Sequence, residues 1–263
     1  MQKKAQAAVQ AAYKAGDLLR NRFRSNFKIR EEAPANLVTE LDIQAEKIIL
    51  DILCLEYPGI PALTEEGLAI SNESPKERWI IDPLDGTTNY AHGYPCFAVS
   101  IALEHYGQIK VGVVYDPMMD QMYTAIQGQG AFVNGEPIRV SHTRTLSKSL
   151  IGSGFPYYAW TNTNNNSSEW AALIKRVVSL RCDGSAALDL CRVASGSLDG
   201  FWELDLEAWD MAAGALIVLE AGGLVTRVEG SPFTPFQRSL LATNGSIHAE
   251  LLDVLMASFS DDH

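Results

Sequence analysis

Apolar residues recur at helical spacing in two stretches near the start of the chain. Between residues 3 and 24, alanine, leucine and aromatic side chains fall near one face of a helix, as expected for an amphipathic segment packed on a core. From Leu41 to Leu53 a second set of apolar positions follows the same spacing. Thr39 stands just before it and has a side chain suited to cap a first helical turn. We therefore predict two helices, the second beginning after Thr39.

Beyond the second helix the apolar positions gather in shorter runs. Turn residues separate these runs, at Tyr106–Gly107 and at Asp116–Pro117, which is typical of consecutive strands. The predicted strands are Arg78–Asp82, Phe97–Leu103, Ile109–Tyr115 and Met122–Ala125.

After residue 145 the pattern changes to alternating strands and helices. The predicted strands are Ser149–Ser153, Phe201–Leu204, Leu224–Val228 and Leu240–Thr243, and the predicted helices are Glu169–Val178, Ala186–Ala194, Trp209–Ala221 and Ile247–Met256. The polar run Thr161–Ser168 predicts an exposed loop. We expect an α+β protein with an N-terminal α+β subdomain at residues 1–145 and a C-terminal α/β subdomain at residues 146–263, without a flexible linker.

Composition narrows the possible partners and compartment. The 263 residues are 47% hydrophobic, enough for a substantial core, and carry a formal net charge of -11. Because so acidic a surface repels nucleic-acid backbones and anionic membranes, we expect neither as a partner. The four cysteines are widely spaced, without a C-x-x-C pair, and are typical of buried thiols in a reducing compartment. The sequence has no apolar signal core and no run of membrane-spanning length, so we expect a cytoplasmic protein.

The segment Trp79–Asn89, W-I-I-D-P-L-D-G-T-T-N, carries the strongest chemical signal. A buried strand that runs into a proline turn presents Asp82 and Asp85 at one end of a sheet. Gly86 permits an unusual backbone angle or the close approach of a ligand. Thr87 is suited to open a helix whose free N–H groups face an anion. Oxygen ligands beside such a helix suit Mg²⁺ bound together with phosphate.

Each acid also has a plain structural interpretation. Asp-Pro and Asp-Gly are common in turns, and the adjacent Glu65 and Glu66 are typical of a solvated turn. Asp210 is suited to the first turn of an apolar helix, and Asp42 stands at the capping-box position three residues after Thr39. The combination of these acids, rather than any one of them, favours a site.

The combination resembles the inositol monophosphatase family, within the superfamily that includes fructose-1,6-bisphosphatases and bisphosphate nucleotidases. The motifs that carry the resemblance are Asn36–Asp42 (N-L-V-T-E-L-D), Glu65–Glu66, Trp79–His92 (W-I-I-D-P-L-D-G-T-T-N-Y-A-H) and Trp209–Gly223 (W-D-M-A-A-G…E-A-G-G). The resemblance implies a layered αβαβα sandwich, a homodimer, and a lithium-sensitive, Mg²⁺-dependent phosphatase.

The resemblance also implies roles for individual residues. Two or three Mg²⁺ ions bind at each site. Their ligands are Glu65, Asp82, the Leu84 carbonyl, Asp85 and Asp210, with Asp82 bridging two ions. Thr87 and Glu65 orient and deprotonate the attacking water, and Asp42 hydrogen-bonds to Thr87. The substrate contacts are Asp85, Gly86, Thr87, Gly184, Ser185, Ala186, Glu203 and Asp210. Of these, Gly86 and Thr87 hold the phosphate, while Glu203 and Asp85 accept bonds from hydroxyls of the alcohol.

Hydrolysis of inositol 1-phosphate to inositol and phosphate is the expected reaction, with a small phosphorylated polyol as the substrate class. The alternatives are fructose-1,6-bisphosphate, histidinol phosphate, NADP or 3′-phosphoadenosine phosphate as substrate, and a protein-binding role in regulating the transcription machinery. The chain departs from the family pattern at Asn36, Thr64 and Tyr90, where aspartate, glycine and phenylalanine are common. None of these departures removes an expected metal ligand.

Overall fold

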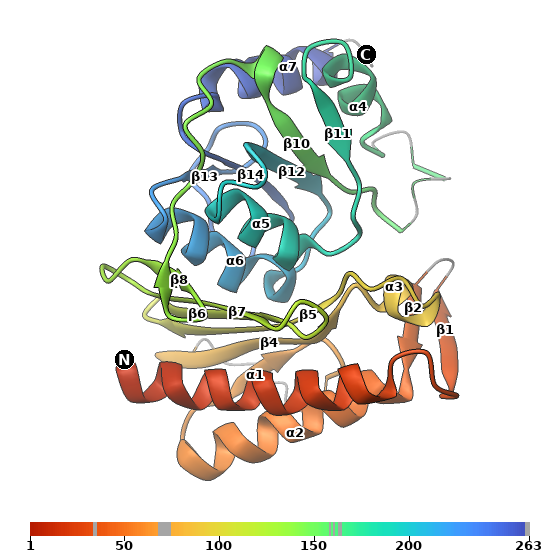
Figure 1. Cartoon of the computed structure of the whole chain (residues 1–263), viewed down its shortest axis with the longest axis vertical. Helices are drawn as coiled ribbons and strands as arrows, with labels where there is room; N and C mark the ends of the chain where they lie inside the picture. Colours follow the sequence, from red (N-terminus) through yellow and green to blue (C-terminus); the bar gives the residue numbers. More distant parts are fainter. Residues whose placement is uncertain (34–35, 68–74, 158, 160, 163–164, 261–263) are drawn as a thin grey trace.

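The computed structural model describes residues 1–33, 36–67, 75–157, 159, 161–162 and 165–260. Layers of helices and sheets alternate through the molecule (Figure 1). Helices α1 (Gln2–Arg22) and α2 (Glu40–Glu56) form one outer layer, and α4 (Ser167–Leu173) and α7 (His248–Ser260) form the other. Between the two sheets lie α5 (Ala186–Ala194) and α6 (Ala208–Glu220). This is the layered αβαβα arrangement that the family resemblance implies.

The first sheet has seven strands that follow one another in chain order. They are β3 (Ala62–Thr64), β4 (Glu77–Asp85), β5 (Ala98–His105), β6 (Gln108–Asp116), β7 (Gln121–Ile126), β8 (Ala131–Val133) and β9 (Glu136–Pro137). Only β3 and β4 pair in parallel among these described strands. Helices cover both faces, so the central strands β5 and β6 are buried along most of their length. A separate hairpin, β1 (Ile29–Ala33) with β2 (Asn36–Thr39), leads into α2.

The second sheet has the order β11-β10-β12-β14-β13. Its strands are β10 (Leu150–Ser153), β11 (Ser179–Arg181), β12 (Gly200–Leu204), β13 (Leu224–Thr226) and β14 (Ser239–Thr243). Strand β10 pairs in parallel with β11 and β12, while β14 pairs antiparallel with β12 and β13. Because β10 and β12 run in parallel with Ser153 opposite Trp202, their carboxyl ends lie at the same edge of the sheet. We propose that the subdomain boundary lies between residues 145 and 146, ahead of this sheet.

Most of the predicted elements are present, with shifted ends. Helix α5 has the predicted bounds, and α2 begins after Thr39, whose side chain accepts a bond from the Leu41 N–H. The helix predicted at Glu169–Val178 begins earlier and ends at Leu173, because the chain then turns and the Val178 N–H bonds to the Ser149 carbonyl at 3.0 Å.

Two expectations about exposure are wrong. Cys96 and Cys191 are buried thiols, but Cys54 and Cys182 are exposed, since neither lies on the buried face of a helix or in a central strand. The predicted loop Thr161–Ser168 also differs from expectation. Residues 163 and 164 lie outside the described part of the chain, Asn166 is buried, and Ser167 already belongs to α4. The side-chain bonds of Asn166 to the end of β10 explain its burial.

The packing of α6 on the first sheet depends on a glycine. A Cβ built on Gly112 of β6 would lie 2.6 Å from the Ala213 carbonyl oxygen in α6. This overlap could be relieved only if the backbone of β6 or that of α6 moved away from the other. We expect Gly112→Ala to lower the free energy of unfolding by about 1–3 kcal/mol, as overpacked cores do, measured by urea denaturation.

Gly59→Ala is the matched control, because a Cβ there meets no atom within 4 Å. Its effect should stay within about 0.5 kcal/mol. Equal losses in the two variants would show that the contact between β6 and α6 is not tight.

Candidate active site

A bulge near the end of β4 brings two aspartates to the same side of the strand. In the pairing with β5, Asp82 lies opposite Ser100 and Asp85 opposite Ala98. Three steps along β4 therefore match two along β5, so one extra residue is inserted. Residues three apart in a regular strand face opposite sides, and the extra residue resets this alternation. The outcome is that carboxylate oxygens of Asp82, Asp85 and Asp210 lie within 4.8 Å of one another.

Gly86 lies between β4 and the short helix α3 (Thr87–Ala91), in a backbone conformation that residues other than glycine rarely adopt. Its φ is 92° and its ψ is 36°. A Cβ at this position would lie 2.9 Å from the Cys96 carbonyl oxygen and 3.1 Å from the Gly184 carbonyl oxygen. The backbone of Gly86 thus packs directly against the loop that precedes α5.

Asp42 reaches the same place from the start of α2. It forms a capping box in which its carboxylate accepts the Thr39 N–H at 2.9 Å. The Thr87 hydroxyl lies 3.0 Å from Asp42 Oδ1 and 2.9 Å from the Leu84 carbonyl oxygen. The structure therefore contains the bond between Asp42 and Thr87 that the family resemblance implies, and the capping interpretation of Asp42 is also correct.

Asp210 likewise combines two interactions. It is the third residue of α6 and accepts the Glu207 N–H at 2.8 Å, which completes a capping box. Its other neighbours are Asp82 and Asp85, which belong to the first sheet. Asp210 therefore caps α6 and also lies where it can bind a cation together with Asp82 and Asp85.

Glu65 follows β3, which runs parallel to β4. Glu65 and Asp82 influence the pKa of each other, and among the described residues the buried Oε2 of Glu65 has no hydrogen-bond partner. Glu46 of α2 holds the chain on either side of Glu65. This fully buried carboxylate accepts the Thr64 hydroxyl at 2.9 Å and the Glu66 N–H at 3.0 Å. Sequence reasoning missed Glu46, although an acid on the apolar face of α2 was a signal.

Burial raises the pKa of every acid in this cluster, and repulsion between carboxylates adds to it for Glu65, Asp82 and Asp210. Burial, followed by repulsion from Asp210, raises the pKa of Glu65 well above its ordinary value, and burial with repulsion from Glu65 does the same to Asp82. Burial raises the pKa of Asp85 to about 6 and, together with the charge on Asp85, that of Asp210 to about 8. A divalent cation would remove this cost. The carboxylates, the Leu84 carbonyl and the unpartnered Glu65 Oε2 form an all-oxygen donor set that fits Mg²⁺.

A pocket of about 370 Å³ opens beside the cluster. The predicted substrate residues that line it are Asp85, Gly86, Gly184, Ser185, Ala186, Glu203 and Asp210. Glu65, Asp42, Asp82, Leu84 and Thr87 are not part of its lining. Asp85 links the two groups, because its Oδ2 accepts the Ser185 hydroxyl and the Ala187 N–H at the start of α5.

Further residues of this pocket were not found by sequence reasoning. Phe155 and Tyr157 form part of the wall. Asn89 also lines the pocket, and its amide nitrogen donates to both the Cys96 and the Asp183 carbonyl oxygens at 2.8 Å. No local periodicity marks these positions, because they meet the acids only through the packing of the two sheets around α5 and α6.

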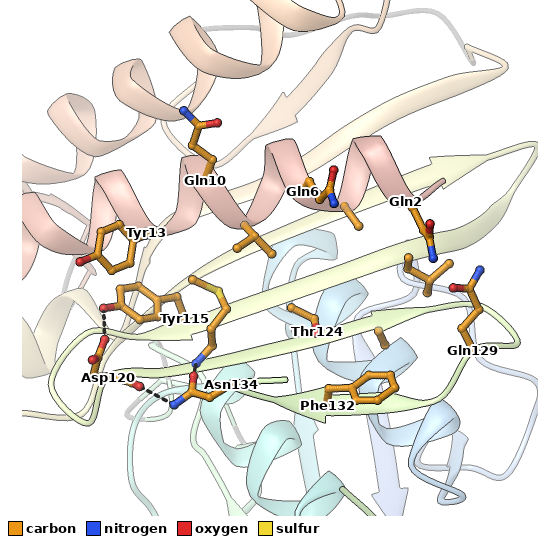
Figure 2. Close-up of a pocket in the computed structure, with 15 residues that line it drawn as sticks. Gln2, Gln6, Gln10, Tyr13, Tyr115, Asp120, Thr124, Gln129, Phe132 and Asn134 are labelled. Atoms are coloured by element: carbon orange, nitrogen blue, oxygen red, sulfur yellow. Dashed lines mark hydrogen bonds between the residues drawn. The ribbon is translucent and has the colours of Figure 1, made fainter. Parts of the chain in front are cut away.

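A larger groove of about 730 Å³ lies elsewhere, between α1 and strands β7 and β8 (Figure 2). Tyr13 packs on Tyr115, with ring centroids 5.6 Å apart, and the Tyr115 hydroxyl donates to Asp120 at 2.7 Å. Glutamine side chains of α1 line its rim. Asp120 is the one acid among its described lining residues, so the groove offers no cluster of ligands comparable with that at β4.

Comparison with known proteins gives consistent relatives along the whole chain. A family profile described as "Inositol monophosphatase family" matches residues 1–260. An inositol-1-monophosphatase of Mesorhizobium japonicum is 43% identical over 254 residues, covering 96% of each chain. A Nus factor SuhB of Pseudomonas aeruginosa is 42% identical and covers 88% of each chain. The solved inositol monophosphatase of Anabaena (Nostoc) sp. PCC 7120 superposes with a TM-score of 0.90 at 41% identity, covering 97% of this chain and 96% of that one.

The raised pKa values predict how the stability of the metal-free protein depends on pH. Asp85 and Asp210 hold protons in the folded state up to about pH 6 and 8, whereas their ordinary pKa is 3.8. The folded state therefore binds more protons than the unfolded state between about pH 4 and 8, so stability should fall as pH rises through this window. Thermal unfolding at several pH values, with chelator present, measures the slope.

Saturating Mg²⁺ should raise the melting temperature most at the upper end of this window, because a cation held by the ionised acid cluster would stabilise only the folded state. Asp82→Asn should be less sensitive to pH without metal and should lose most of the Mg²⁺ response. Asp51→Asn, at an exposed position of α2, is the control and should behave like the parent. An Mg²⁺ response retained in Asp82→Asn would mean that the cation binds elsewhere.

Proposed function

This chain belongs to the inositol monophosphatase family of metal-dependent phosphomonoester hydrolases, and we propose that it hydrolyses inositol 1-phosphate to inositol and phosphate with Mg²⁺ as its cofactor. The observation that carries the proposal is the cluster of Asp82, Asp85 and Asp210, whose oxygens lie within 4.8 Å of one another at the edge of a 370 Å³ pocket. Such a cluster suits a cation-held phosphate, and the pocket beside it suits the alcohol.

The proposal includes two or three Mg²⁺ ions. Glu65, Asp82 and the Leu84 carbonyl would hold one ion, while Asp82, Asp85 and Asp210 would hold a second. The unpartnered Oε2 of Glu65 supports its part in this set. When bound, the ions neutralise charge on the phosphate, make water a better nucleophile and stabilise the leaving alcohol.

The protein side chains would position and deprotonate the water. The single hydroxyl hydrogen of Thr87 points toward Asp42 Oδ1 and the Leu84 carbonyl oxygen, which are both within hydrogen-bond distance. The lone pairs of Thr87 Oγ1 are therefore available to accept a hydrogen bond from a water molecule. The proton lost by that water would pass to Glu65, whose buried Oε2 has no hydrogen-bond partner among the described residues and is free to accept it. The N–H groups of Gly86 and Thr87, at the start of α3, would donate to the phosphate.

The alcohol would occupy the pocket lined by Gly184, Ser185, Ala186 and Glu203. Small side chains on one wall leave space for a ring, and the carboxylates of Glu203 and Asp85 would accept bonds from its hydroxyls. Asp85 Oδ2 is already bonded to Ser185 and the Ala187 N–H, which leaves Oδ1 for this purpose or for a cation.

The remaining parts of the proposal concern assembly and compartment. We infer a homodimer from the family alone. All four cysteines are unpaired thiols, which supports a reducing compartment such as the cytoplasm. Among the described residues no helix has the length and apolar character needed to cross a bilayer.

A second candidate function is binding to the transcription machinery, favoured by the similarity to the Nus factor SuhB of Pseudomonas aeruginosa. The complete set of acids supports the enzyme instead, because a protein contact does not need a buried cluster of carboxylates. Phosphate release compared with a pulldown of transcription proteins separates the two functions.

We expect phosphate release from inositol 1-phosphate to require Mg²⁺ and to stop with excess EDTA, because cations would offset the repulsion among the clustered carboxylates and hold the phosphate. Mn²⁺ should replace Mg²⁺ in part, since it accepts the same ligands. The measurement is a phosphate-release assay over a panel that includes fructose-1,6-bisphosphate, histidinol phosphate, NADP and 3′-phosphoadenosine phosphate. Full turnover in EDTA would contradict the metal chemistry, and a higher kcat/KM for a nucleotide would contradict the substrate.

Two glutamates should differ in what they control. Glu65→Gln should lower kcat for every substrate, because Glu65 serves the water that all substrates share. Glu203→Gln should lower kcat/KM for inositol 1-phosphate about ten- to hundredfold, since a hydrogen bond to a charged acceptor contributes about 1.5–3 kcal/mol.

The comparison substrate is p-nitrophenyl phosphate, which has no hydroxyls near the ester and should lose much less in Glu203→Gln. The ratio of the two kcat/KM values in parent and variant is the readout. If Glu203→Gln leaves the ratio unchanged, this glutamate does not contact the alcohol.

A further inference from the structure

Gly154 and Glu203 meet at the edge of the second sheet where β10 and β12 end. Gly154 follows directly after β10, and Glu203 is the fourth residue of β12. The two strands pair in parallel with Ser153 opposite Trp202. Gly154 and Glu203, the residues that follow this pair, therefore lie side by side. Both residues line the pocket beside the acid cluster.

The side chain of Glu203 fills the space that a side chain at position 154 would need. A Cβ built on Gly154 would lie 2.1 Å from Glu203 Oε1, 2.4 Å from Cδ and 2.5 Å from Oε2. All three nearest atoms belong to this one carboxylate. The φ of Gly154 lies outside the left-handed range, so the backbone itself would accept an alanine. The requirement for glycine therefore comes from Glu203.

A side-chain hydrogen bond restrains the backbone of Gly154 against moving away from Glu203. Asn166, which is buried, donates from Nδ2 to the Gly154 carbonyl and to the Ser153 hydroxyl. Its Oδ1 accepts the Trp202 indole N–H at 2.6 Å. One side chain thus ties together the ends of β10 and β12. A side chain added at position 154 would then be relieved by movement of the Glu203 carboxylate into the pocket.

Among the described residues, no hydrogen-bond or ion-pair partner holds the Glu203 carboxylate. The charges that face it are the carboxylates of Asp189, Asp210 and Asp85, which repel it and, after burial itself, raise its pKa. With no donor among the described residues to fix it, the carboxylate is positioned by packing against the backbone at Gly154.

We propose that Gly154 is a positioning residue, which places the Glu203 carboxylate at the depth where it can accept a hydroxyl of the alcohol and so selects polyol phosphates. The inference rests on the proposed function of the pocket. Because Gly154 has no side chain, the Glu203 carboxylate can occupy the space beside it. The hydrogen bonds of Asn166 to Gly154 and Trp202 fix the position of that space.

Gly154→Ala should therefore reproduce the specificity defect of a Glu203 variant. We expect kcat/KM for inositol 1-phosphate to fall about ten- to hundredfold, the range of a lost bond to a charged acceptor. For p-nitrophenyl phosphate we expect a change of no more than about threefold, because a substitution that removes no contact to the substrate usually changes the free energy by about 0.5 kcal/mol or less. The melting temperature and its shift with Mg²⁺ should match those of the parent and of Gly59→Ala, the control without neighbours.

A double-mutant cycle tests whether the effect passes through Glu203. In a Glu203→Ala background the clashing carboxylate is gone, so adding Gly154→Ala should cost nothing further for inositol 1-phosphate. If the double variant instead shows the product of the two single-variant losses in kcat/KM, the proposal is overturned, because Gly154 would then act on something other than Glu203.

A crystal structure of Gly154→Ala gives a readout that does not depend on turnover. The Glu203 carboxylate should be displaced from its parent position, and an unmoved carboxylate would overturn the proposal whatever the kinetics. Failure of the proposed function is distinguishable, because it is measured on the parent protein alone. If the parent prefers another phosphomonoester of the panel, the same cycle is performed with that substrate.

Discussion

Carboxylates packed together away from water repel one another, and the structure around β4 depends on how this repulsion is met. Four acids at this site each accept a hydrogen bond from a backbone N–H. Asp82 accepts from Leu84, Asp85 from Ala187, Asp210 from Glu207 and Asp42 from Thr39. Three of these acids sit at the N-terminal ends of α2, α5 and α6, where the helix dipole favours negative charge. The protein thereby offsets part of the repulsion, and cations would offset the rest.

This arrangement explains why the helices between the two sheets are central to function. Asp85 ends a strand of the first sheet, yet its carboxylate is bonded at the start of α5. Asp210 belongs to α6, and its carboxylate lies within 4.8 Å of those of Asp82 and Asp85 on the first sheet. Gly112 lets α6 approach the first sheet closely. The cluster is complete only when α5 and α6 are packed against that sheet, so packing and chemistry share the same contacts.

Several residues serve structure and site together, so the two interpretations of an acid need not compete. Asp42 and Asp210 are capping residues because helix starts supply free N–H groups, and the same positions place them beside Thr87 and Asp82. Thr64, a departure from the common glycine, has a use of its own, because its hydroxyl bonds to the buried Glu46 beside Glu65. A local pattern marks such a residue as a cap, and only the fold reveals its second contact.

The sequence by itself determined the helices and the longer strands, because apolar periodicity and caps such as Thr39 act locally. It also marked Asp82, Asp85 and Gly86, since a strand, a proline turn and a glycine lie within a few residues. It did not predict short strands such as β8 and β11, nor the exposure of Cys54 and Cys182. Only the tertiary structure decided that Glu46 supports Glu65, that Asn166 is buried, and that Gly154 makes room for Glu203. These contacts join segments far apart in the chain, and the parallel pairing of β10 with β12 creates a proximity that no local pattern encodes.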